Sequence, residues 1–127
     1  MDASANILNW FEISVSDFER AKKFYETIFS ITMEDMDMAG MKMAMFPYDM
    51  MSGKLSGAIV KSDMHKPSAD GVKIYFNGNP DLDEALSKVE AAGGKITLPK
   101  GKISDEIGYM AFFMDTEGNA VALHSQG

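Results

Sequence analysis

The sequence predicts an α+β fold in which two βαβββ units form curved sheets around a central cavity, with the helices outside. Two observations support this prediction. Each half of the chain has the pattern of a strand, an amphipathic helix and three further strands. The two helical stripes also match at a constant offset of 64 residues, from Phe18 to Leu82 and from Ala21 to Ala85. An offset of about half the chain indicates an internal duplication.

The first unit is expected to cover about residues 6–60. Residues 7–15 are rich in β-branched and aromatic side chains and predict a strand. Ser16 has Glu19 three residues later, the spacing of a capping box at a helix start. The apolar positions of that helix are Phe18, Ala21, Phe24, Tyr25 and Ile28. Three strands are expected to follow, at 31–36, 41–46 and 55–60.

The second unit is expected at about 72–125, after a polar linker at 61–71, so that residues 1–127 form a single domain. A strand is predicted at 72–77, and Pro80 with Asp81 marks the start of a helix. The glycine pair at 93–94 predicts its end. The helical stripe is Leu82, Ala85, Leu86, Val89 and Ala92. The remaining strands are predicted at 95–98, 110–114 and 119–124.

Composition narrows the function classes. The chain has 127 residues, of which 46% are hydrophobic and 24% charged, with a net charge of −7 and no cysteine. A chain without cysteine has no disulfides, thiolate metal sites or thiol nucleophiles. The negative charge argues against nucleic acid as a partner. No apolar run is long enough for a membrane span, and the start of the chain lacks the pattern of a secretory signal. We therefore expect a cytoplasmic protein.

Several short motifs occur in a characteristic order along the chain. They are Val15–Ala21, the pair Phe24-Tyr25, the pair Tyr75-Phe76, Asp81–Ala85, the pair Gly93-Gly94 and Asp115–Asn119. In order and spacing they resemble the vicinal-oxygen-chelate superfamily of glyoxalases, bleomycin-resistance proteins and dioxygenases, and its small glyoxalase-like members of unassigned function. The resemblance implies the fold described above and a homodimer. Whether the two units pair within one chain or between two chains stays open.

The same resemblance allows the metal site of the superfamily to be checked position by position. Its metal-using members take one ligand from the first and one from the last strand of each unit. These positions fall at Trp10, at Lys73 or Ile74, at Ala122, and within 54–61, a segment without Asp, Glu or His. None of them offers a good metal ligand. The sequence therefore predicts no metal and no other cofactor.

Two titratable residues lie close to the positions where metal-using members of the superfamily have their ligands. Glu12 is two residues after Trp10, and His124 is two residues after Ala122. Side chains two apart on a strand share a face, so Glu12 and His124 are the candidate catalytic residues, provided that their strands are neighbours. The other reading is that both are solvated at the mouth of the cavity. His65 lies in the polar linker and is expected to be exposed, without a role.

Four further residues are candidates for ligand binding: Trp10, Met43, Lys73 and Tyr75. Lys73 and Tyr75 share a face by the same alternation. Eight of the twelve methionines fall between residues 33 and 51. A methionine stripe can adapt to varied apolar ligands, although ordinary core filling is the simpler interpretation.

Three functions remain open on these grounds. The first is a protein that binds a small molecule in a metal-free cavity, as bleomycin-resistance proteins do. The second is an enzyme, a lyase or isomerase acting on a small oxygenated substrate, with Glu12 or His124 as the base. The superfamily includes lactoylglutathione lyases and dioxygenases, which keeps this alternative open. The third is a structural or interaction domain whose cup is filled by side chains.

Overall fold

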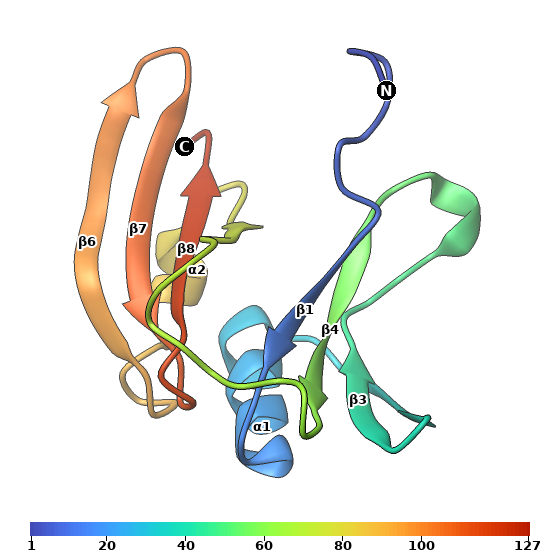
Figure 1. Cartoon of the computed structure of the whole chain (residues 1–127). Helices are drawn as coiled ribbons and strands as arrows, with labels where there is room; N and C mark the ends of the chain where they lie inside the picture. Colours follow the sequence, from blue (N-terminus) through green and yellow to red (C-terminus); the bar gives the residue numbers. More distant parts are fainter.

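Residues 1–127 are all described by the structure, a computed structural model. The first half contains the strands β1 (Trp10–Ser14), β2 (Glu34–Met38), β3 (Met41–Met45) and β4 (Ser56–Lys61), with the helix α1 (Phe18–Phe29) and the short 3₁₀ helix Met50–Ser52 (Figure 1). Its strands form one sheet in the order β1-β4-β3-β2, with β1 parallel to β4 and the other pairs antiparallel. We call this the first sheet.

The second half repeats the same topology. It contains β5 (Tyr75–Asn77), the helix α2 (Asp83–Leu86), β6 (Lys95–Ser104), β7 (Gly108–Met114) and β8 (Ala120–Ser125). These strands form the second sheet, in the order β5-β8-β7-β6, and β5 is parallel to β8. The predicted α+β class with two βαβββ units is confirmed. No helix is long and apolar enough to cross a membrane.

Element boundaries differ from the predicted ones where backbone hydrogen bonds outweigh the side-chain pattern. The strand β6 continues to Ser104 instead of ending near residue 98, with register shifts along its pairing to β7. The helix α2 is a single α-helical turn, because the backbone after Leu86 makes several bonds to the third residue back, such as Lys88 N–H to Ala85 O at 3.0 Å. The predicted stripe at Leu82, Ala85, Leu86 and Val89 is nevertheless buried.

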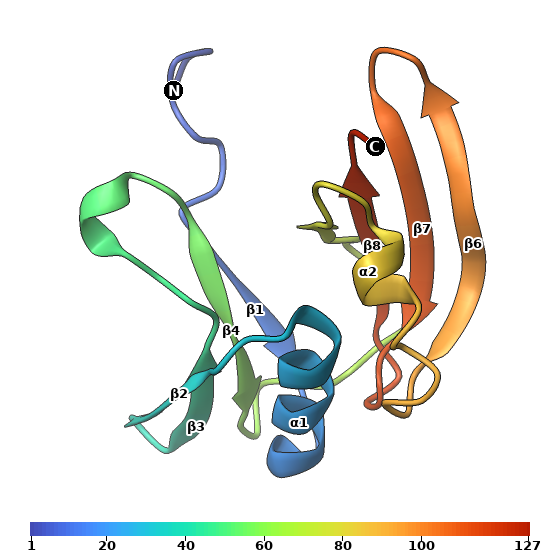
Figure 2. The same cartoon turned by 180° about the vertical axis from the view of Figure 1, so that it is seen from behind.

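Both helices lie between the two sheets (Figures 1 and 2). One core cluster of 19 buried residues includes residues from both units. Within it the Phe24 ring of α1 lies 5.9 Å from the Phe113 ring of β7, and the Tyr25 ring lies 5.6 Å from the Phe46 ring. The partly buried Phe76 packs against the cluster, 5.8 Å from the Tyr25 ring. The helix α1 therefore packs on the first sheet with one side and on the second sheet with the other.

This packing differs from the expected arrangement around one central cavity with the helices outside. The sheets do not close into a barrel. The apolar face of α1 is buried against both sheets at once. No apolar helix surface is therefore left to cover the other face of either sheet. As a consequence, the sheet faces that do not contact the helices, here called the outer faces, point away from each other in a single chain.

The turn at Asp115–Asn119 joins the second unit to the start of α1. The Glu117 carboxylate accepts hydrogen bonds from the backbone N–H groups of Ser16 (2.9 Å) and Asp17 (2.7 Å). It also accepts from Arg20 Nε at 2.7 Å and from Thr116 Oγ1 at 2.9 Å. The sequence pattern indicated a capping box from Ser16. The N-cap is instead Asp17, whose side chain accepts from Arg20 N–H at 3.1 Å, while Glu117 takes the Ser16 N–H.

Two other side chains of the same turn reach the first unit. Tyr25 donates its hydroxyl to Asp115 Oδ2 at 2.7 Å, and burial followed by the charge of Asp115 raises the pKa of Tyr25 well above its ordinary value. Asn119 donates from Nδ2 to Ser14 O at 2.8 Å and accepts from Ser68 N–H at 3.0 Å. The turn therefore contacts the end of β1, the helix α1 and the linker.

Replacing Glu117 by Gln should destabilise the protein and change its acid sensitivity. Burial of Glu117 raises its pKa, but the bonds from Arg20, Asp17, Thr116 and Ser16 outweigh burial and lower the pKa from 4.5 to about 2. A lowered pKa stabilises the fold above the unfolded-state value and loses this effect as the pH falls. We expect Glu117→Gln to cost about 3 kcal/mol in the free energy of unfolding at pH 7.

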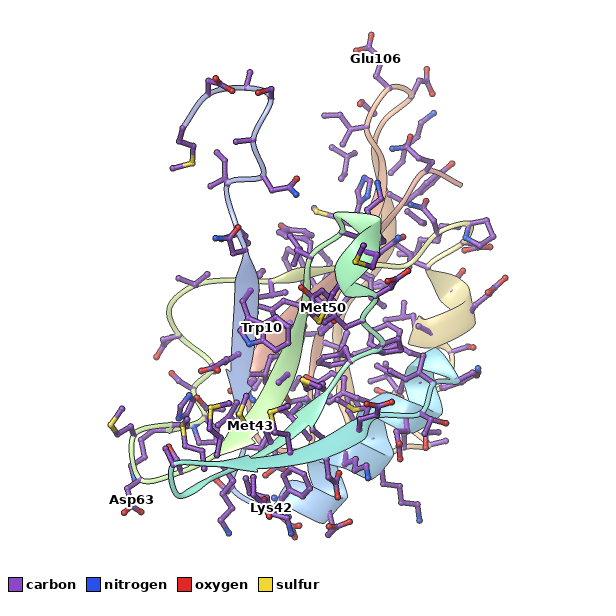
Figure 3. The ribbon with its side chains drawn as sticks, turned by 90° about the vertical axis from the view of Figure 1, so that its right-hand side faces the viewer. Trp10, Lys42, Met43, Met50, Asp63 and Glu106 are labelled. Carbon is purple, nitrogen blue, oxygen red and sulfur yellow. The ribbon has the colours of Figure 1, made fainter.

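The measurement is urea unfolding of both proteins between pH 2 and pH 7. The wild type should lose more stability than Glu117→Gln as the pH falls from 4.5 to about 2. The control is Glu106→Gln, which removes an exposed carboxylate at the β6–β7 hairpin (Figure 3) and should leave the profile unchanged. Parallel pH profiles for wild type and Glu117→Gln would contradict this account.

Candidate functional site

The outer face of the first sheet carries two predicted ligand-binding residues, Trp10 and Met43. Figure 3 views the chain from the side of this sheet. Met43 is only 4% exposed and forms a small cluster with Ala58 and Val60, against which the partly buried Trp10, Met41 and Met45 pack. Tyr48 lies edge-on to Trp10, with 5.6 Å between the rings. The methionine stripe predicted from the sequence exists, and its side chains pack against each other.

The outer face of the second sheet carries a groove of about 560 Å³. Two predicted residues line it, Tyr75 from β5 and His124 from β8. The other lining residues are Phe76, Asn77, Asn79, Ile103, Ile107 and Met110. The groove thus combines an apolar wall with an imidazole, a phenol and two amides, the composition typical of small-molecule sites. Ile103 and Ile107 were missed because strands were predicted at 95–98 and 110–114, which left both residues in a loop.

His124 is held at the edge of this groove by the β6–β7 hairpin. Its Nε2 lies 2.6 Å from the carbonyl oxygen of Ile107. A carbonyl only accepts, so this nitrogen carries the proton, and in the neutral ring Nδ1 is left as an acceptor. A half-buried histidine with one fixed nitrogen can bind a ligand donor or accept a proton.

Lys73 and Tyr75 meet at the ring of Phe112 on β7. The ammonium group of Lys73 lies 4.2 Å from the centre of that ring, and the Tyr75 ring lies 6.1 Å from it, nearly perpendicular. Both residues also line a second, more apolar groove of about 450 Å³, which includes Phe11 and Phe46 of the first unit. Lys73 is exposed and lies at the border of this second groove.

Glu12 does not meet His124 in a single chain, because each lies on the outer face of a different sheet. Glu12 instead binds His65, with 2.9 Å between Glu12 Oε1 and His65 Nε2. The other ring nitrogen of His65 lies 2.7 Å from Ser62 Oγ. The expectation that His65 is exposed and unengaged was wrong, since its side chain is 16% exposed and has a partner on each nitrogen. The Ser-x-x-His spacing across a tight bridge was the available signal.

The residues at the family's metal positions do not fit a metal ion. Ala122 is fully buried beside Tyr75, and Trp10 pairs with Ser56 across β1 and β4. The outward positions of β4 are Ser56, Ala58 and Val60, none of which is a carboxylate or imidazole. No three His, Cys, Asp or Glu side chains of one chain come together.

Comparison with known proteins places the chain in a family. The profile of the Glyoxalase/Bleomycin resistance protein/Dioxygenase superfamily matches residues 7–123. The chain belongs to the glyoxalase/bleomycin-resistance/dioxygenase superfamily. It is 29% identical over 118 residues to "Putative glyoxylase CFP32" of Mycobacterium bovis, and the match covers 91% of this chain and 44% of that protein. The chain therefore spans less than half the length of this relative.

Solved structures of other superfamily members share the fold. A glyoxalase/bleomycin resistance protein from Albidiferax ferrireducens superposes with a TM-score of 0.68 at 18% identity, covering 96% of this chain and 100% of that one. The fosfomycin resistance protein FosX from Listeria monocytogenes superposes with a TM-score of 0.62 at 19% identity, covering 95% and 90%. At these identities the superpositions establish the fold, and the function must be argued from the site.

The tautomers of both histidines give a direct check of the two sites. His124 and His65 should each carry a proton on Nε2, because a carbonyl and a carboxylate face that nitrogen. Long-range ¹H–¹⁵N spectra at pH 8 measure this for the neutral rings. Glu12→Gln should broaden or shift the His65 signals, because it changes the partner of His65 Nε2. A proton on Nδ1 of His124 would contradict the described hairpin contact.

Proposed function

We propose that the protein binds a small, partly apolar molecule in the groove of the second sheet, without a metal. The observation that supports this most directly is that Tyr75 and His124, both predicted from the sequence, line one groove of about 560 Å³. The groove offers polar groups from Tyr75, Asn77, Asn79 and His124 together with isoleucine and methionine side chains. Superfamily membership fits this proposal, since the superfamily includes bleomycin-resistance proteins.

The proposed working form is a cytoplasmic homodimer in which two copies complete each site. In one chain the outer faces point away from each other, and each is open on one side. The first offers Trp10, Met45 and Glu12, and the second offers Tyr75 and His124. If the first sheet of one copy faces the second sheet of another, all five surround one cavity. Exposed apolar side chains at the groove, such as Tyr75 (50%) and Ile107 (53%), favour such a cover.

The second candidate is a metal-independent lyase or isomerase with a histidine or carboxylate as the base. The observation that favours it is the fixed orientation of His124, whose Nδ1 is left as an acceptor while Nε2 donates to Ile107. Glu12 suits the same role less well in one chain, because it already accepts from His65. In the proposed dimer, Glu12 of one copy lies across the cavity from the other copy's His124.

A ligand screen with matched variants tests the proposed site. Small metabolites and antibiotics that raise the melting temperature of the wild type should bind Tyr75→Ala and His124→Ala about tenfold or more weakly, because each variant removes a groove wall. Leu98→Ala is the control, since Leu98 is a partly exposed apolar residue outside the groove.

The readouts are thermal shift and isothermal titration calorimetry with the compounds found. Equal affinity of all three variants would place the binding site elsewhere and contradict the proposal. Conversion of a bound compound by the wild type, lost in His124→Ala but with binding retained, would favour the enzyme. Binding without conversion supports the binding protein.

A further inference from the structure

A second hollow lies at the far end of the first sheet, away from the groove of Tyr75 and His124. Its volume is about 580 Å³, and its walls come from the start of α1, the β2–β3 turn and the linker after β4. Lys42 and Asp63 lie at this end of the sheet in Figure 3. The ten lining residues are Val15, Ser16, Gly40, Lys42, Lys61, Ser62, Asp63, His65, Lys66 and Pro67. Val15 and Pro67 supply its only apolar side chains.

Three of the residues that line this hollow are lysines, although the chain as a whole has a net charge of −7. Lys42 and Lys61 are direct cross-strand partners of β3 and β4. Like charges in directly opposed positions destabilise a sheet. The third, Lys66, lies in the linker that closes the hollow. Asp63 is the only acid in the wall.

Acidic residues compensate the charge of Lys42, because Asp37 is its cross-strand partner on β2 and Glu19 lies close to it. Glu19 lies 3.7 Å from the ammonium group of Lys42, and both side chains are about half exposed or more. Lys42 also lies over the ring of Phe18, at 4.7 Å. Lys61 and Lys66 take part in no ion pair. Glu12 binds His65 on the side of Nε2.

The wall is also held in place by contacts outside the lysines. His65 is fixed between Ser62 and Glu12, at 2.7 Å and 2.9 Å. Ser62 Oγ accepts from Met64 N–H at 3.1 Å, and the backbone of His65 pairs with that of Ser62. These bonds hold the linker to Glu12 of β1, and Lys66, the residue after His65, lines the hollow.

We propose that this hollow is a binding site for a small phosphate-bearing anion, separate from the groove of the second sheet. A phosphate group carries a charge of about −1.5 to −2 at neutral pH, which matches several ammonium groups better than a single carboxylate does. Lysine binds phosphate as a point charge on a flexible stem, so Lys61 and Lys66, which have no ion pair in the chain, are free to bind it. An anion bound beside Lys42 and Lys61 would also reduce the repulsion between these two cross-strand neighbours.

The test is a titration of ¹⁵N-labelled protein with inorganic phosphate at about 0.15 M ionic strength, followed by ¹H–¹⁵N spectra. We expect saturable shifts confined to residues 15–16, 40–42 and 61–67. The variant Lys61→Gln/Lys66→Gln should weaken binding about tenfold or more, because two charge contacts are lost. Both side chains are exposed, and unchanged spectra elsewhere will show that the variant folds.

The control is Lys54→Gln/Lys95→Gln, which makes the same charge change at two exposed lysines outside the hollow. It should change the affinity for phosphate by no more than about twofold, because charges distant from the hollow are largely screened. Equal weakening in both variants, or shifts that do not saturate, would overturn the proposal. A parallel titration with glycerol 3-phosphate identifies the source of the phosphate: tighter binding than inorganic phosphate indicates a phosphorylated metabolite, and equal binding indicates the free ion.

Discussion

The hydrogen bonds of Glu117 to the start of α1 fix how the two units of this chain sit together. The carboxylate has no exposed side-chain surface, and it receives two backbone N–H groups and the Arg20 side chain. It therefore acts as a second cap, supplied from the other unit, on the helix that fills the space between the sheets. Because α1 packs on both sheets, its position determines which sheet faces are buried and which point outward. The arrangement of the candidate sites depends on this contact.

Much of the fold could be predicted from the sequence, because strand alternation and helical spacing are local signals. The stripe from Phe18 to Ile28 predicted the buried face of α1, and all five of its residues are buried. The sequence could not show that this one face serves two sheets. A pattern of apolar residues marks what is buried but does not say which surface covers it, so the position of the helices between the sheets had no local signal.

Strand alternation also explains which candidate residues could be grouped from the sequence and which could not. Tyr75 and His124 line one groove because β5 and β8 are neighbours within one unit. Glu12 and His124 belong to different units, and their proximity depended on how the units pack, which strand alternation does not determine. The contact between His65 and Glu12 joins residues 53 positions apart, and only the path of the linker brings it about.

The outward orientation of both outer faces is the reason to expect that a second copy completes the site. Because the chain has no cysteine, a nitroxide label can be attached at a single introduced cysteine, Met45→Cys. The labelled protein is then mixed with unmodified protein that carries ¹⁵N. Residues 45 and 124 lie on opposite outer faces of one chain, so a label can broaden the other copy's His124 only across an interface. We predict broadening of the ¹⁵N signals of Tyr75, Met110 and His124 in the mixed sample. Unbroadened signals at these residues, under conditions where the protein is dimeric, would contradict the account.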